Sequence, residues 1–176
     1  MNVEGNIIKD KKVIAFQIKN EEYALAVDQV NSIERMMPIT RVPHTSRFIK
    51  GVINLRGVVL PVIDLRTRLG IEETEYMKQT RIIMVETSDV ETGLIVDAAN
   101  DVISISDDEI EEVQETFNSV HADYIEGILK LDARLLVLLN LEKVLADPTL
   151  EMNKQKPEQK NPDEAIKEGN KAEQEA

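Results

Sequence analysis

The chain has 176 residues, of which 42% are hydrophobic and 31% charged, a composition typical of a soluble globular protein. It contains no cysteine, which excludes disulfides and thiolate metal sites and favours a reducing compartment. A formal net charge of −12 argues against nucleic acid as a partner.

The first third of the chain predicts strands. Residues 1–10 are expected to be a flexible N-terminus, without the apolar segment of a signal peptide. Runs rich in β-branched and aromatic residues predict a hairpin of strands 13–18 and 23–27, followed by a strand over 30–36. No apolar run approaches the roughly 20 residues that a membrane-spanning helix needs, so we expect a cytoplasmic protein that does not insert into a membrane.

Residues 38–70 combine turn signals with two further strands. Thr45 or Ser46 is expected to cap a short helical turn that Gly51 closes. Strands over 52–55 and 58–64 should flank a tight turn at Arg56 and Gly57. Pro61 places the second of these strands at an edge or a bulge. A helical turn over 65–69 follows.

The second half is expected to repeat this plan. Strands over 81–86 and 94–96 should flank a loop, and strands over 125–131 and 134–139 should form a hairpin. Ser106 and Glu109 have the spacing of a capping box. A short helix is expected over 141–145. The acidic tail, residues 147–176, is almost devoid of apolar residues and is predicted to be disordered.

The chain contains an internal repeat. A shift of 76 residues aligns 51–65 with 127–141 without a gap, and a shift of 69 aligns 13–17 with 82–86 and 25–28 with 94–97. The repeat predicts two related β-subdomains, about 11–76 and 77–146, with strands possibly exchanged. Each is near the size below which a lone core is marginal, so we expect a shared aliphatic seam. The matched pairs expected in that seam are Leu60 with Leu136 and Val27 with Val96.

Charge is distributed unevenly between the two halves. Residues 30–70 hold seven basic and two acidic groups, whereas residues 71–126 hold two basic and sixteen acidic groups. Solubilising charge on exposed loops would explain any one of these residues. The excess as a whole favours a surface that steers and orients protein partners.

Catalytic chemistry has little support in the sequence. The two histidines, His44 and His121, have no partners at metal-ligand spacing, and no nucleophile–base pair or phosphate-binding loop is present. We therefore predict no catalytic residues, no metal and no cofactor, and a protein that is not an enzyme.

The turn at Arg56 and Gly57 is the strongest candidate site. An arginine on a tight turn presents its planar donors from a rigid base, which suits a carboxylate or a carbonyl of a partner. Val30 and Ile33 are expected to supply an apolar patch beside it. Phe117 is a rare aromatic in a polar stretch, and it is either tucked under its own loop or an interface anchor.

Residues 48–66, Phe48-Ile-Lys-Gly-Val-Ile-Asn-Leu-Arg-Gly-Val-Val-Leu-Pro-Val-Ile-Asp-Leu-Arg66, resemble the signature of the CheW coupling-protein family of bacterial chemotaxis. The similarity extends over about 11–146. It implies an all-β fold of two intertwined five-stranded SH3-like barrels. It also implies an adaptor that joins the cytoplasmic domains of chemoreceptors to the regulatory domain of the histidine kinase CheA.

The resemblance also implies the roles of particular residues. Val30, Ile33, Arg56 and Gly57 would bind the receptor, and Phe117 would face the kinase. Ser32 stands where many relatives have Glu. The protein would be a monomer that joins larger arrays through its partners.

Two classes of function remain after this reading. The first is the adaptor. The alternative is a small all-β barrel that binds a polar ligand or nucleic acid, against which the negative charge and the scarcity of aromatic residues count.

Overall fold

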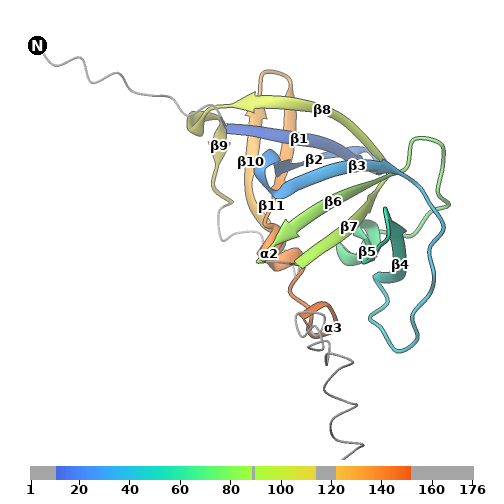
Figure 1. The fold of residues 1–176 in the computed structure, drawn as a ribbon. Helices are drawn as coiled ribbons and strands as arrows, with labels where there is room; N and C mark the ends of the chain where they lie inside the picture. The colour runs from blue at the N-terminus through green and yellow to red at the C-terminus, as the bar shows by residue number, and fades with distance from the viewer. Residues whose placement is uncertain (1–10, 89, 114–121, 152–176) are drawn as a thin grey trace, which may run out of the picture.

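A computed structural model describes residues 11–88, 90–113 and 122–151, and within these ranges the chain is mostly β-structure (Figure 1). Eleven strands in these ranges are joined by turns, by the longer loops over 36–48 and 69–80, and by helices of at most four residues. The all-β class expected from the sequence is confirmed. None of the helices in the described ranges is long and apolar enough to cross a membrane.

The first three strands follow the predicted pattern closely. They are β1 (Lys11–Ile18), β2 (Glu21–Ala26) and β3 (Val30–Arg35), with a 3-10 turn η1 (Val27–Gln29) before β3. Lys19 takes a positive φ of 55° in the tight turn between β1 and β2. In β1 the buried side chains form a continuous run because both faces of the strand are covered.

The next segment corrects one prediction. Strand β4 (Ile49–Leu55) begins where a helical turn closed by Gly51 was expected, so Thr45 and Ser46 cap no helix. Gly51 instead has a φ of 142°, and a Cβ there would lie 2.1 Å from the Thr40 carbonyl oxygen. Its glycine is therefore needed for close approach of segment 36–48 to β4, where Thr40 and Val52 exchange two backbone hydrogen bonds of 2.9 Å.

Strand β5 (Val58–Asp64) and the short helix α1 (Leu65–Arg68) follow as predicted. Pro61 does not make β5 an edge strand, since β4 and β7 lie on its two sides. The parallel pairing with β7 covers only Val62–Asp64, however, so Pro61 lies just outside it and its missing N–H interrupts no bond of that ladder.

The middle of the chain contains more strand than predicted. Strands β6 (Arg81–Thr87) and β7 (Val90–Val96) pair as far as Thr87 and Val90, within the range where a loop over 87–93 was expected. Strand β8 (Ala98–Ile105) was not predicted. The predicted capping box forms in a single 3-10 turn, η2 (Asp107–Glu109), where the Ser106 amide donates to Glu109 Oε2 at 2.9 Å.

The last described elements correct the predicted start of the tail. They are β9 (Ile110–Glu111), a 3-10 turn η3 (Ala122–Tyr124), β10 (Ile125–Leu131), β11 (Arg134–Leu139), α2 (Leu141–Val144) and α3 (Pro148–Glu151). Residues 147–151 were expected to be disordered, but Pro148–Glu151 form α3 and Leu150 in it is buried. The rest of the predicted tail lies outside the described residues.

The strands form two sheets that exchange elements between the two halves of the chain. One sheet has the order β8-β1-β2-β11-β10-β9 and the other β3-β6-β7-β5-β4. The hairpin β1–β2 therefore joins strands of the second half, and the hairpin β6–β7 joins strands of the first half (Figure 1). The first sheet has six strands rather than the expected five, because β9 adds a two-residue edge.

The repeat read from the sequence is preserved in the strand register. Val62 pairs with Gly93 in the parallel ladder of one sheet, and Leu138 pairs with Ala24 in the other, as shifts of 76 and 69 residues require. Both sheets also contain a β-bulge at an equivalent position. In one sheet it lies in β3, between Val30 and Ser32, and in the other it lies in β8, opposite Ala15 and Phe16. The two halves thus share strand register and the position of a bulge as well as the sequence repeat.

Three clusters of buried hydrophobic side chains form the core among the described residues. The central cluster joins both halves and includes Phe16, Leu25, Ile63, Ile83, Leu94, Leu139, Leu141 and Leu150. Leu60 and Leu136 were predicted to lie in this seam, but they do not. Each occupies the separate cluster of its own sheet, because the repeat places them at equivalent positions of the two sheets. Val96 is in the seam, but Val27 is only partly buried.

Candidate functional site

The tip of the β4–β5 hairpin is built around two residues with positive φ. Arg56 has a φ of 51° and Gly57 a φ of 86°. The Gly57 amide donates a hydrogen bond of 2.9 Å to Oδ1 of Asn54, which closes the turn from inside. No atom lies within 4 Å of a Cβ built on Gly57, so the backbone conformation rather than space requires glycine here.

Arg56 reaches from this tip to the far edge of the same sheet. Its Nη2 lies 3.2 Å from Oε1 of Glu34 on β3, at the opposite end of the strand order. The contact shows that the sheet curls until its two ends approach, as in a barrel. The Arg56 side chain is 76% exposed and that of Glu34 only 19%. An ion pair this exposed stabilises the fold by at most about 1 kcal/mol, so the guanidinium remains available to a partner.

A bulge in β3 determines which face its side chains share. Val30 pairs with Val85, and Ile33 pairs with Ile83, although a regular strand would place residues three apart on opposite faces. The bulge between Val30 and Ser32 therefore puts Val30 and Ile33 on one face. Val30 packs partly against the central cluster, whereas Ile33 is 42% exposed.

The predicted site residues are therefore only partly brought together. Glu34, not Ile33, makes the contact with Arg56, and the register places Glu34 opposite Ile82, on the other face from Ile33. Val30 and Ile33 form a separate apolar strip along β3. Phe117 lies outside the described residues, and its predicted role remains a prediction.

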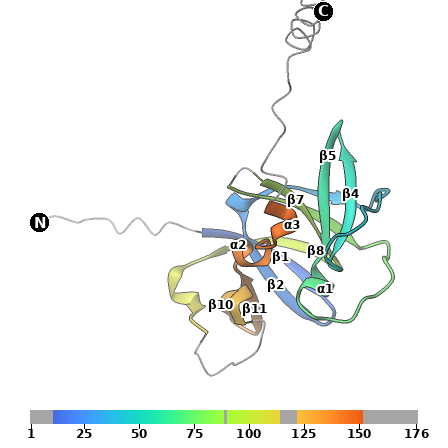
Figure 2. The same ribbon diagram turned by 90° about the horizontal axis from the view of Figure 1, so that it is seen from below.

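Two exposed valines were missed by the sequence reasoning. Val58 and Val59 follow Gly57 directly, and their side chains are 54% and 65% exposed. Alternation within a strand would bury one of the two. Both are exposed because the β4–β5 hairpin projects beyond the body of the molecule (Figure 2). Consecutive valines after an Arg-Gly turn were the available signal for this apolar surface.

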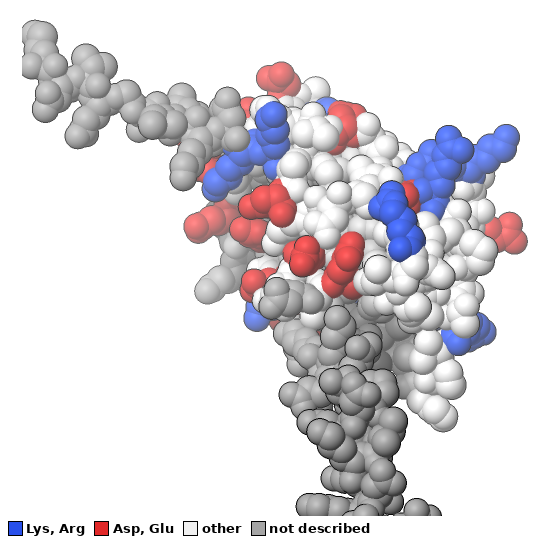
Figure 3. All heavy atoms as spheres, viewed as in Figure 1, with Lys and Arg blue, Asp and Glu red and all other residues white. Residues whose placement is uncertain are grey.

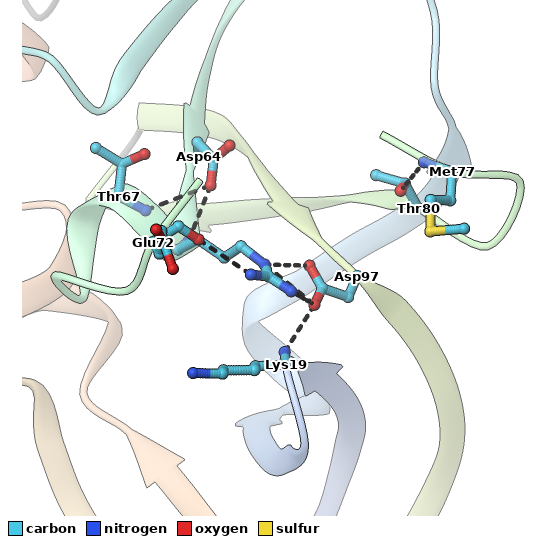
Figure 4. Close-up of polar contacts among 8 residues, drawn as sticks. Lys19, Asp64, Thr67, Glu72, Met77, Thr80 and Asp97 are labelled. Carbon is cyan, nitrogen blue, oxygen red and sulfur yellow. Dashed lines mark hydrogen bonds and ion pairs between the residues drawn. The ribbon is translucent and has the colours of Figure 1, made fainter. Parts of the chain in front are cut away.

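A polar cluster anchors the base of this hairpin to both halves of the chain. Arg66 Nε donates to Asp97 Oδ1 at 2.8 Å, and Arg66 Nη2 also contacts Asp97 Oδ2. The Lys19 amide donates to Asp97 Oδ2 at 2.7 Å, and the Glu72 carbonyl accepts from Arg66 Nη1 at 3.0 Å (Figure 4). The cluster ties the β1–β2 turn to the start of α1 and to the end of β7.

The same region holds α1 in place through a buried carboxylate. Asp64 is 3% exposed, and its Oδ1 accepts from the amides of Arg66 and Thr67 at 2.9 and 3.4 Å. Its Oδ2 accepts from the Tyr76 hydroxyl at 3.0 Å. Asp64 is thus a fully bonded N-cap, and Asn140 caps α2 at the equivalent position of the repeat.

The structure offers little material for catalysis in the ranges it describes. No group of three or more His, Asp or Glu side chains there is placed to hold a metal ion. His44 lies on an exposed turn with a φ of 60°, and His121 is outside the described residues. The features that do stand out are a projecting hairpin tip, an exposed guanidinium and an apolar strip, which are the properties of a protein-binding surface.

The fold and this surface define a protein-interaction module, and comparisons with known proteins identify its family. A model of the CheW-like domain matches residues 12–149. The chemotaxis protein CheW of Bacillus subtilis (strain 168) is 47% identical over 135 residues, which cover 77% of this chain and 86% of that protein. The chain therefore belongs to the CheW family.

Two further relatives agree in length and in structure. The chemotaxis protein CheW of Thermotoga maritima is 32% identical over 152 residues, covering 85% of this chain and 97% of the relative. The crystal structure of the scaffolding protein TtCheW from Thermoanaerobacter tengcongensis superposes with a TM-score of 0.73 at 36% identity, covering 79% of this chain and 94% of that one. The resemblance stated for residues 48–66 is thus confirmed.

Proposed function

We propose that this protein is a non-enzymatic adaptor that couples the cytoplasmic domains of chemoreceptors to the regulatory domain of the histidine kinase CheA. Membership of the CheW family supports this role. The observation that carries it is the Arg56 guanidinium, held at a rigid hairpin tip, 76% exposed, and restrained by one weak ion pair. The adaptor would act in the cytoplasm as a monomer that joins larger arrays.

The receptor-binding surface we propose consists of Arg56 and Gly57 with the apolar strip of Val30 and Ile33. A receptor carboxylate or carbonyl would replace Glu34 as the partner of Arg56, which is accessible because the Arg56 side chain is 76% exposed. Ile33 on β3, and Val58 and Val59 next to Gly57, supply apolar area that a partner would remove from water.

The kinase would bind a different part of the same rigid body. The central cluster contains side chains from both sheets, so a displacement imposed on the receptor side has a packed route to the remainder of the molecule. Phe117 remains the predicted kinase contact.

The binding role of Arg56 can be tested with a matched turn variant. Asp132 occupies the equivalent position of the β10–β11 turn and also has a positive φ, of 41°. Arg56→Ala and Asp132→Ala therefore change the conformational preferences of equivalent turns. Calorimetric titration with a receptor cytoplasmic fragment should show a loss of about 2 kcal/mol or more for Arg56→Ala and little change for Asp132→Ala.

Both variants should keep the melting temperature of the wild type within a few degrees. Receptor affinity that is unchanged in a folded Arg56→Ala protein would exclude Arg56 from the receptor-binding surface. Equal losses of receptor-binding free energy in the two variants would show that the loss comes from a changed turn conformation and not from the missing guanidinium.

A further inference from the structure

A second polar surface lies at the opposite end of the β4–β5 hairpin from Arg56. Here segment 39–50 and the loop at 73–76 line a cleft that is open to solvent and has a volume of about 830 Å³. Because β4 runs from Ile49 beside the cleft to Leu55 near the tip, about 20 Å of strand separates the two surfaces. We call this surface the basic cleft. Its lining residues used below are Arg41, Val42, Arg47, Lys50, Glu73 and Tyr76.

Positive charge exceeds negative charge in the basic cleft. Three cationic side chains line it against one carboxylate, Glu73. Lys50 Nζ lies 2.8 Å from Glu73 Oε1, and Arg47 Nε lies 3.8 Å from the same oxygen with its side chain 84% exposed. Within the described ranges Arg41 has no carboxylate partner. The Arg41 guanidinium is therefore available to bind an anion through its planar donors, and the exposed Arg47 guanidinium has only one long contact, with Glu73.

Glu73 is fixed as an anion inside the cleft. Hydrogen bonds from Lys50 and from the Thr67 hydroxyl, the latter 3.1 Å long, lower the pKa of the Glu73 carboxyl. One oxygen of Glu73, Oε1, contacts Lys50, Arg47 and Thr67. Glu73 therefore occupies the position that a carboxylate of a partner would take.

Two of the side chains that line the mainly polar cleft, Val42 and Tyr76, supply partly exposed apolar surface. The Val42 and Tyr76 side chains are 41% and 42% exposed. Tyr76 is held in place by the hydrogen bond of its hydroxyl to the buried Asp64. Figure 3 shows several basic side chains on the right of the molecule, the side of β4 and β5 in Figure 1, whereas most acidic side chains lie over the left and centre. The cleft therefore combines local positive charge with the apolar surface of two side chains.

We propose that the basic cleft binds an acidic segment of a protein partner, through carboxylates on Arg41, Arg47 and Lys50 and an apolar side chain between Val42 and Tyr76. A free phosphate would use the cations but leave this apolar surface exposed. A nucleic acid would extend its charge over the acidic remainder of a protein of net charge −12. A short acidic segment stays within the basic region, because charges farther away than about 8 Å are screened at physiological salt.

The probe for this site is a fluorescein-labelled peptide, Glu-Glu-Leu-Glu-Glu-Leu-Glu-Glu, followed by fluorescence anisotropy with the full chain at physiological salt. A peptide with glutamine in place of every glutamate is the matched probe. Arg41→Glu with Arg47→Glu should reduce affinity at least about tenfold, because two attractive pairs become repulsive. Glu73→Gln should increase affinity several-fold, because it releases Lys50 and Arg47.

Lys12→Glu with Lys143→Glu is the control, since it changes net charge equally at exposed positions outside the cleft. Affinity for the acidic peptide should stay within about twofold of the wild type in this control. Equal losses in both double variants, or equal binding of the glutamine peptide, would overturn the proposal. Competition by inorganic phosphate at the same concentration as the peptide would assign the cleft to small anions instead.

Two other occupants give distinct results. If the wild type sediments as a dimer and Arg41→Glu with Arg47→Glu sediments as a monomer, a second copy of this chain is the occupant. That result would contradict the proposal. Tighter binding of a single-stranded oligonucleotide than of the peptide would also contradict it. Receptor-fragment binding by the cleft variant reports separately on the proposed adaptor function, because Arg56 is left intact.

Discussion

A single carboxylate, Asp97, connects three segments of the chain at the residue scale. Burial alone would raise the pKa of the Asp97 carboxyl, but hydrogen bonds from Arg66 and from the Lys19 amide outweigh burial and lower that pKa below its ordinary value of 3.8. A group whose pKa is lowered in the folded state stabilises the fold above its unfolded pKa. This contribution is lost as the pH falls through the folded-state pKa.

We therefore predict that Asp97→Asn lowers the melting temperature at pH 7 and that the deficit shrinks as the pH falls below about 4. Asp28→Asn is the matched control, because Asp28 is the repeat counterpart of Asp97 and is exposed. Thermal melts of the three proteins between pH 3 and 7 measure the effect. A deficit for Asp97→Asn that persists undiminished at pH 3 would show that packing, not ionisation, is responsible.

At this scale the sequence predicted the turn but not its contacts. Arg56 and Gly57 follow from turn chemistry, because an arginine beside a glycine between two β-rich runs indicates a hairpin tip. The contact of Arg56 with Glu34 could not be predicted, since it depends on how far the sheet curls. Val59 was missed because period-two alternation assumes that the hairpin stays within the sheet.

At the scale of elements, α3 is held by contacts to distant parts of the chain. Leu150 is 3% exposed within the central cluster, and Asp147 Oδ2 accepts from the Ser46 hydroxyl at 3.0 Å. Arg68 donates to the Val144 and Ala146 carbonyl oxygens at 2.8 and 3.0 Å, just before α3 begins. These contacts connect α3 to the first half of the chain.

Truncation after Ala146 should therefore destabilise the protein, whereas truncation after Glu151 should not. Removing Leu150 from the core costs roughly 2 kcal/mol, the free energy of burying one leucine side chain. For a protein of this size we expect a melting temperature about 5 °C lower. Calorimetry of the two truncated proteins makes the comparison, and equal melting temperatures would mean that α3 contributes nothing to stability.

The elements show where sequence patterns were sufficient. Strongly β-rich runs such as 13–18 and 81–86 were predicted almost to the residue, and the shifts of 76 and 69 residues relate the registers of the two parallel ladders to each other. Strand β8 was missed because Ala98 to Asp101 has low β-propensity and lies at a sheet edge. Leu150 was missed because one apolar residue in a polar tail carries no periodicity.

At the scale of the whole molecule, the exchange of strands makes the two halves mutually dependent. Cutting between residues 76 and 77 separates β2 from β11 and β5 from β7, and it also divides the central cluster. Each half would retain hairpins without the sheets that cover them, and isolated hairpins are marginally stable in water.

We predict that residues 1–76 and 77–151, produced separately, show no cooperative thermal unfolding, and that mixing them restores a cooperative transition. Circular dichroism of the separate and mixed fragments measures this. If either fragment melted alone near the temperature of the full chain, the halves would be independent modules. A receptor-side displacement could not then be transmitted through a shared core.

The adaptor function makes its strongest demand on the whole molecule, because receptor and kinase must bind at the same time. The most direct measurement is a pull-down of the CheA regulatory domain by an immobilised receptor cytoplasmic fragment, with and without this protein. We expect the kinase domain to be retained only when the protein is present. Arg56→Ala should abolish that retention while leaving kinase binding in solution intact. Two results would contradict the account. One is that the kinase domain is retained without this protein, and the other is that it is not retained when the protein and the receptor fragment are both present.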